Sequence, residues 1–183
     1  DKIPNKKSGE CLYTGIMTDS GSFRFPSTTA ETHRIVADLM DLGVDNAEVY
    51  NLVNNTSSEH RLRLLGYCID DKLNVFSKYG TAFISLSLEE KKRFHFQKGD
   101  TEGTVNYPLS IEGVCFSAIF IEAEELIKIS FRSIGDFDVN MFARTHFEGG
   151  GHRNAAGGRS DLGLQETIDK FVGLLPEYAD KLK

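Results

Sequence analysis

The chain has 183 residues, of which 40% are hydrophobic and 26% charged, as in ordinary globular proteins of one or two domains. Its 21 basic and 27 acidic residues leave a net charge of −6, which disfavours long duplex DNA because binding to it depends largely on phosphate neutralisation. No apolar run approaches the roughly 20 residues that span a bilayer, so we expect no contact with a membrane. Three scattered cysteines without a CxxC pair (Cys11, Cys68, Cys115) favour a reducing, cytoplasmic location.

The first part of the chain predicts one strand followed by three helices. Residues 11–18 (CLYTGIMT) are expected to form a short, mostly buried strand that runs into a polar turn at 19–22. Each helix begins at capping residues, namely Thr28 with Glu31, Asp45 with Glu48, and Ser57 or Ser58. The third helix looks like a connector, because the periodicity changes from helical to alternating after it.

From residue 73 the pattern changes to strands with helices between them. We expect strands at 73–76, 81–87, 114–121 and 126–132. Helices are expected after Ser87, after Asp138 and over 164–175, with a helical or irregular segment near 105–109. The fold class is therefore α/β. We divide the chain into the C-terminal remnant of a parallel-sheet lobe (1–57), a connecting helix (58–73) and a mixed-sheet lobe (74–183).

A glycine-rich segment near the C-terminus carries the strongest chemical signal. Five of the 17 glycines fall within residues 149–158, in GGGHRNAAGG. Consecutive glycine amides can converge on an anion, and His152 and Arg153 can donate to its oxygens. The alternative is that Gly149 ends a helix and the other glycines form a tight turn. Because that alternative explains one glycine but not three followed by His-Arg, we favour a phosphate-binding loop.

Two further residues are candidates with a strong structural alternative. Arg132 ends an alternating strand and could bind a terminal phosphate, or it could belong to a solvated polar face. Asp19 could be a metal ligand or a catalytic carboxylate, or its carboxylate could bond the amides of Gly21 or Ser22 in a local turn. Taken alone, the residues favour the structural alternative for both.

Several segments together resemble the DHH family of phosphoesterases over nearly the whole chain. They are TGIMTDSGSFRF with PSTT behind it, the connector helix, the strand that ends in FRS, and GGGHRNAAGG. The resemblance is greatest to the bacterial members that degrade very short oligoribonucleotides from the 3′ end and also remove the 3′-phosphate from 3′-phosphoadenosine-5′-phosphate. It implies a catalytic lobe with two manganese ions and a smaller lobe that binds the substrate.

The resemblance also assigns roles to residues. Asp19 is similar to the last metal-ligating aspartate of the family, and Arg132 with Ser133 to part of its nucleotide-phosphate site. Gly149, Gly150, Gly151 and His152 are similar to the loop that holds the scissile or terminal phosphate, with Arg153 beside it. The Asp-His-His triplet that names the family is absent from the chain. One carboxylate cannot hold two divalent ions, so we expect the chain to supply substrate binding and one metal ligand but no intact catalytic centre.

Three functions remain open from the sequence. The first is a metal-dependent phosphodiesterase and phosphomonoesterase acting on short oligoribonucleotides or phosphorylated nucleotides. The second is an exopolyphosphatase or inorganic pyrophosphatase of the same family, which would share the chemistry. The third is a nucleotide-binding module without catalysis. The oligomeric state is also open, a homodimer included.

Overall fold

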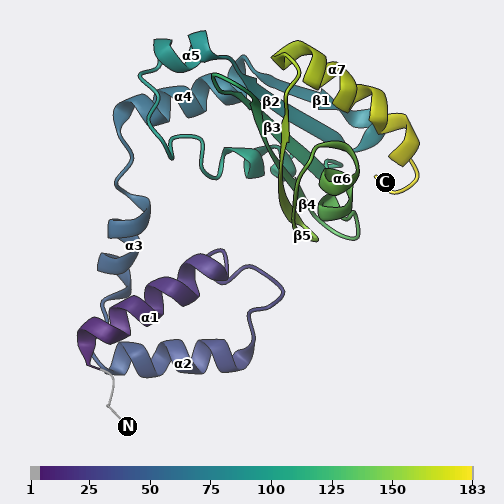
Figure 1. Cartoon of the computed structure of the whole chain (residues 1–183). Helices are drawn as coiled ribbons and strands as arrows, with labels where there is room; N and C mark the ends of the chain where they lie inside the picture. The colour runs from purple at the N-terminus through teal and green to yellow at the C-terminus, as the bar shows by residue number, and fades with distance from the viewer. Residues whose placement is uncertain (1–4, 183) are drawn as a thin grey trace. The chain divides into compact units, whose positions relative to one another are not determined.

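The computed structural model describes residues 5–182 (Figure 1). By their contacts they divide into two compact units that part between Ser57 and Ser58. Along the described residues, no helix is both long and apolar enough to cross a membrane.

The first unit is built from three helices, α1 (Lys6–Asp19), α2 (Ala30–Asp41) and α3 (Asn46–Asn54). Helix α1 packs against both of the others. Their shared core consists of Tyr13, Met17, Val36, Leu39, Val44 and Val49. Asp45 caps α3 as expected, but α2 begins one residue later than predicted, with a capping box between Thr29 and Thr32 rather than Thr28 and Glu31.

The strand expected at residues 11–18 is wrong, because this segment lies in helix α1. The helix begins earlier, at a capping box between Asn5 and Ser8. Its buried residues Gly9, Tyr13 and Met17 recur every four positions, which is a helical spacing. A short apolar run fits either element, and here the packing of that stripe on α2 and α3 decides it. The expected remnant of a parallel-sheet lobe therefore contributes helices alone within residues 5–57.

The second unit is organised around a six-stranded sheet in the order β1-β2-β3-β4-β6-β5 (Figure 1). The strands are β1 (Leu73–Phe76), β2 (Thr81–Leu86), β3 (Phe116–Glu122), β4 (Ile127–Ser133), β5 (Gly150–His152) and β6 (Ala155–Ser160). Only β2 and β3 run parallel, and every other neighbouring pair is antiparallel. The expected mixed α/β fold is confirmed, as are the four strands predicted between residues 73 and 132.

Helices and short 3₁₀ turns surround the sheet. They are α4 (Glu59–Asp70), η1 (Ser77–Tyr79), α5 (Leu88–Arg93), η2 (Thr104–Ser110), α6 (Val139–His146), α7 (Leu164–Leu174) and η3 (Leu175–Tyr178). Side chains of Ser58, Ser87 and Asp138 cap α4, α5 and α6, in agreement with the sequence. Helix α4, the expected connector, packs on β1, β2 and η2 and so belongs to the second unit.

The two faces of the sheet are covered to different extents. Helices α6 and α7 cover one face with an aromatic core that includes Phe116, Phe131, Phe142, Phe147 and Phe171. On the other face, α4 and η2 cover β2 and β3 through Leu64, Cys68, Ile84, Val105 and Ile119. The same face of β4, β6 and β5 carries polar residues and glycines that are exposed or half-exposed. We call this side of β4, β6 and β5, turned away from α6 and α7, the open face.

Candidate functional site

The glycine-rich segment forms a β hairpin rather than the expected loop. Strands β5 and β6 pair antiparallel, with His152 opposite Ala155, and Arg153 and Asn154 make the turn between them. The turn is therefore not made by the glycines. The Gly149 amide does donate to the Ala143 carbonyl at the end of α6 (3.2 Å), which explains one glycine as a helix-end residue.

Two of the glycines are required by close backbone approach. A Cβ at Gly149 would collide with the Gly157 carbonyl oxygen, and one at Gly151 with the Ala155 carbonyl oxygen. Gly157 lies on the open face, where a Cβ would meet nothing closer than 3.7 Å, whereas a Cβ at its partner Gly150 would contact Arg144 Nε (3.4 Å) and Asn140 Oδ1 (3.6 Å) of α6. Gly157 thus presents bare backbone to the open face, and Gly150 lies against α6.

The strand register brings Arg132 and His152 onto the open face together. Arg132 on β4 is paired with Ala155 on β6, and Ala155 is paired with His152 on β5. Directly opposed residues of antiparallel strands point to the same side, so the two long side chains flank a small one. Since neighbouring strands lie about 4.8 Å apart, the Cα atoms of Arg132 and His152 are roughly 10 Å apart. An anion that sits over Ala155 can reach both side chains.

The next rows of the same face continue this pattern. Ser130, Gly157 and Gly150 form one row, and Lys128 with Arg159 forms another. Arg159 is an exposed residue whose guanidinium pairs with Glu148 (2.9 Å). The open face therefore has cationic side chains at both ends of β4 and a nearly bare backbone between them.

Arg132 is a partly buried cation that forms no ion pair with a carboxylate of the described residues. Its side chain is half-buried, and its Nη1 donates to the Phe131 carbonyl (2.9 Å). Burial lowers the pKa of the guanidinium, which nevertheless stays protonated. Within residues 5–182, no salt bridge pairs Arg132 with a carboxylate. A buried charge is normally paired, so this guanidinium is suited to an incoming phosphate.

Ser133 and Arg153 lie near this row but are engaged by the protein itself. Ser133 is buried on the opposite face, where its Oγ donates to the Phe137 carbonyl (2.7 Å) and accepts from Asn154 Nδ2 (2.9 Å). Arg153 is exposed at the hairpin turn and pairs with Asp136 (3.0 Å). Of the predicted substrate-binding residues, the strand register thus brings together Arg132 and His152, while Gly150 lies against Arg144 and Asn140 of α6. Gly149, Gly151 and Ser133 shape the hairpin and its loop.

Sequence reasoning missed two asparagines that hold the hairpin. Asn154 Nδ2 donates to Ser133 Oγ and to the Gly135 carbonyl (3.1 Å). Asn140 on α6 accepts from the Gly151 amide (2.9 Å) and from Arg144 Nε (3.0 Å). Asn154 lies in the conspicuous GGGHRNAAGG segment, but its partner could not be read from the sequence. The spacing of Asn140 and Arg144 indicates only a helical pair.

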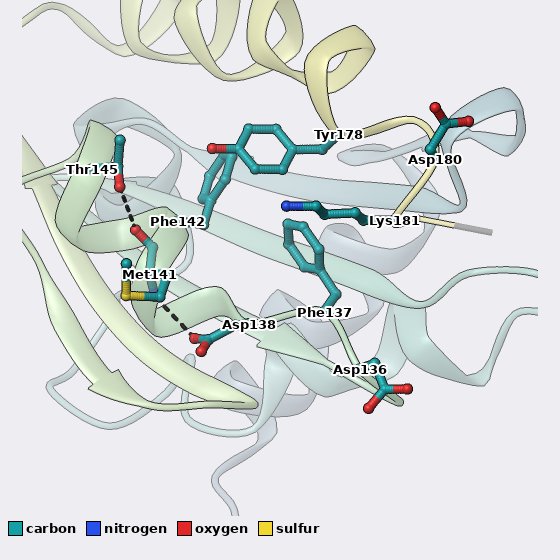
Figure 2. Close-up of a pocket in the computed structure, with 9 residues that line it drawn as sticks. All are labelled: Asp136, Phe137, Asp138, Met141, Phe142, Thr145, Tyr178, Asp180 and Lys181. Atoms are coloured by element: carbon teal, nitrogen blue, oxygen red, sulfur yellow. Dashed lines mark hydrogen bonds between the residues drawn. The ribbon is translucent and has the colours of Figure 1, made fainter.

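A cleft of about 630 Å³ lies elsewhere in the second unit (Figure 2). Helix α6, the loop before it and residues 178–181 line this cleft, where the Lys181 side chain reaches between the rings of Tyr178 and Phe137 toward Phe142. Neither Arg132 nor His152 lines it. The candidate site is therefore defined by charge and strand register on an open surface.

The metal ligands implied by the family are not assembled by the described residues. Asp19 is the exposed last residue of α1. Within residues 5–182, no group of three or more His, Cys, Asp or Glu side chains could hold a metal ion. The described residues thus do not fit a two-metal centre, and the role of Asp19 as a single metal ligand stays a prediction.

Comparison with known proteins identifies the family. The DHHA1 domain matches residues 77–181, which include Arg132 and the whole glycine hairpin. The chain belongs to the DHH family of phosphoesterases. The bifunctional oligoribonuclease and PAP phosphatase NrnA of Thermus thermophilus is 33% identical over 91% of this chain and 49% of its own length. The protein of that name from Bacillus subtilis is 29% identical over 84% of this chain and 47% of its own length. The chain thus spans about half the length of these DHH relatives.

Solved structures agree with this assignment. An exopolyphosphatase-related protein from Bacteroides fragilis superimposes with a TM-score of 0.94 at 44% identity, over 97% of this chain and 52% of that one. A pGpG-specific phosphodiesterase from Vibrio has a TM-score of 0.53 at 15% identity, over 94% of this chain and 55% of that one, which shows a common fold alone. The DHH fold described above is therefore that of experimentally determined relatives.

Proposed function

We propose that this chain is the substrate-binding part of a phosphoesterase that acts on very short oligoribonucleotides from the 3′ end and on 3′-phosphoadenosine-5′-phosphate. The observation that carries the proposal is the row Arg132–Ala155–His152, in which a half-buried guanidinium, without a carboxylate partner among residues 5–182, lies two strands from an exposed imidazole. The relatives named for these activities are similar over most of the chain.

The chemistry of the row suits a terminal phosphate. The Arg132 guanidinium can donate two parallel hydrogen bonds to non-bridging oxygens, and an imidazole N–H of His152 can donate a third. Gly157 leaves room for a sugar or a second phosphate beside the first, since even a Cβ there would meet nothing closer than 3.7 Å. In this proposal the chain binds the substrate. The proposal gives no described residue a role in the hydrolytic step, or as a ligand of the manganese ions that the family implies.

Calorimetric titration of the 183-residue chain with a 5′-phosphorylated diribonucleotide tests the proposal. His152→Ala is expected to weaken binding tenfold or more, a loss of about 1.4 kcal/mol. His60→Ala is a matched control, because His60 is an exposed histidine at the start of α4. Equal affinity of His152→Ala and wild type, or absence of binding by the wild type, would contradict the proposal.

A second candidate function is hydrolysis of inorganic polyphosphate. It is favoured by the 44% identity to the exopolyphosphatase-related protein, which exceeds the identity to the oligoribonuclease relatives. Both functions would bind phosphate at the row Arg132–Ala155–His152. They differ in whether a nucleoside on the ligand increases its affinity for the chain. Competition between the diribonucleotide and inorganic tripolyphosphate separates them: tighter binding of the nucleotide supports the first function, and tighter binding of tripolyphosphate the second.

A further inference from the structure

Strand β5, which presents His152, has little of its own to hold it in place. It contains three residues, two of them glycine, and among the strands of residues 5–182 it lies at one edge of the sheet, paired with β6. Glycines bring no side-chain packing and lose more conformational freedom on folding than any other residue. The position of His152 therefore depends on contacts that reach the β5 backbone from outside the sheet.

Helix α6 supplies such a contact through one side chain. Asn140 Oδ1 accepts from the Gly151 amide at 2.9 Å, which satisfies an edge amide that faces no further strand. The same oxygen accepts from Arg144 Nε at 3.0 Å, one helical turn further along α6. Because both partners are donors, the amide of Asn140 is held with its oxygen toward β5 and cannot turn its NH₂ group there.

The other contacts of the hairpin hold its turn or the residue before β5, where the Gly149 amide donates to the Ala143 carbonyl (3.2 Å). The Arg153 carbonyl accepts from the Val139 amide (2.8 Å), and the Asn154 carbonyl accepts from the Ser133 amide (3.1 Å). These bonds fix the far end of the hairpin on the start of α6 and the end of β4. Asn140 acts on the residue directly before His152.

We propose that Asn140 is a positioning residue for substrate binding: through the Gly151 amide it holds β5 so that His152 and Arg132 bind the same phosphate. The inference rests on the proposed function and adds a residue that neither touches the substrate nor lies on the open face. Arg144 supports it by fixing the orientation of the Asn140 amide. Loss of the Asn140 oxygen frees β5 to move, while the aromatic core beneath the sheet stays intact.

The test compares variants of the full 183-residue chain by two measurements, the affinity for 3′-phosphoadenosine-5′-phosphate and the hydrogen-exchange rate of the Gly151 amide. Asn140→Ala is expected to speed exchange at Gly151 at least tenfold and to weaken binding about tenfold. Asn140→Asp keeps an acceptor oxygen, and Arg144 balances its charge, so it should restore slow exchange and bring the affinity to within about threefold of wild type. Asn74→Ala, on the opposite edge strand, is the control and should change neither measurement.

The outcomes separate this inference from the proposed function. If His152→Ala loses binding while Asn140→Ala keeps it despite fast exchange at Gly151, the positioning role is overturned and the proposed function stands. If Asn140→Asp restores slow exchange but not affinity, the positioning role is likewise overturned. If His152→Ala binds as tightly as wild type, the proposed function fails, and the inference fails with it.

Discussion

The two halves of the sheet differ in how they are covered, and the difference separates stability from binding. Strands β2 and β3 are covered on both faces, and all six residues of β2 are buried. Strand β4 is fully covered on one face and only partly by η2 on the other, so that buried Ile127, Ile129 and Phe131 alternate with the less buried Lys128, Ser130 and Arg132. The less covered half of the sheet is the half to which the proposed function assigns the ligand.

The comparison is sharpest at two adjacent residues of β4. Phe131 points into the aromatic core and is fully buried, whereas Arg132 points to the open face. Substitutions at these neighbours should therefore affect different properties. The following predictions test the contrast between the covered and the open face, from the largest expected effect on stability to the smallest.

Phe131→Ala should cost about 3–5 kcal/mol of unfolding free energy. The Phe131 ring contacts the rings of Phe116, Phe142, Phe147 and Phe171, with centroids 5.4 to 6.3 Å apart. Removing it leaves a cavity beneath helices that cannot collapse freely. Urea denaturation of the variant and the wild type measures the loss. A loss below about 1 kcal/mol would mean that the covered face does not carry the stability of this unit.

Acid should lower the unfolding free energy of the second unit, because it protonates the Glu90 carboxylate. Burial by itself raises the pKa of the Glu90 carboxyl, but hydrogen bonds from Lys72, the Ser87 amide and Tyr67 outweigh it and lower the pKa to about 2. The folded pKa is thus below the ordinary value of 4.5, so the stabilisation is complete above pH 4.5 and is lost as the pH falls toward 2.

We expect the loss to be about 1–2 kcal/mol, after allowance for solvent screening of a carboxylate that is not fully buried. Urea denaturation between pH 7 and pH 3 measures it as the difference between wild type and Glu90→Gln, since the variant has no charge to lose at this position. Parallel pH profiles for the two proteins would refute a stabilising role for the hydrogen bonds that Glu90 on α5 accepts from Tyr67 on α4 and from Lys72.

Arg132→Met should leave the unfolding free energy unchanged or raise it by up to about 1 kcal/mol. The substitution keeps the apolar stem of the side chain and removes a half-buried charge that has no carboxylate partner among the salt bridges of the described chain. Binding of the 5′-phosphorylated diribonucleotide should weaken at least tenfold in the same variant. Denaturation and calorimetry together check this, and a stability loss above about 1 kcal/mol would place Arg132 among the structural residues.

Much of the second unit was predictable from local signals. The alternation over residues 126–132 predicted both the strand and the side on which Arg132 lies, because a strand has a period of two. The capping residues Ser58, Ser87 and Asp138 marked three helix starts correctly, since their side chains satisfy amides within the same turn. The strand predicted at residues 11–18 is wrong because a short apolar run fits a helix as well as a strand. Packing on α2 and α3 selected the helix.

The sequence by itself determined the family, the residue types of the site and most of the secondary structure, because these depend on side chains and their near neighbours. Only the tertiary structure decided that the glycine segment is a hairpin, since that required β4 as a partner for β6. Only the register of three strands could place His152 beside Arg132 across Ala155. The contact of Asn140 with the Gly151 amide was likewise beyond the sequence, because a hydrogen bond between a helix and a strand edge leaves no periodic trace in either.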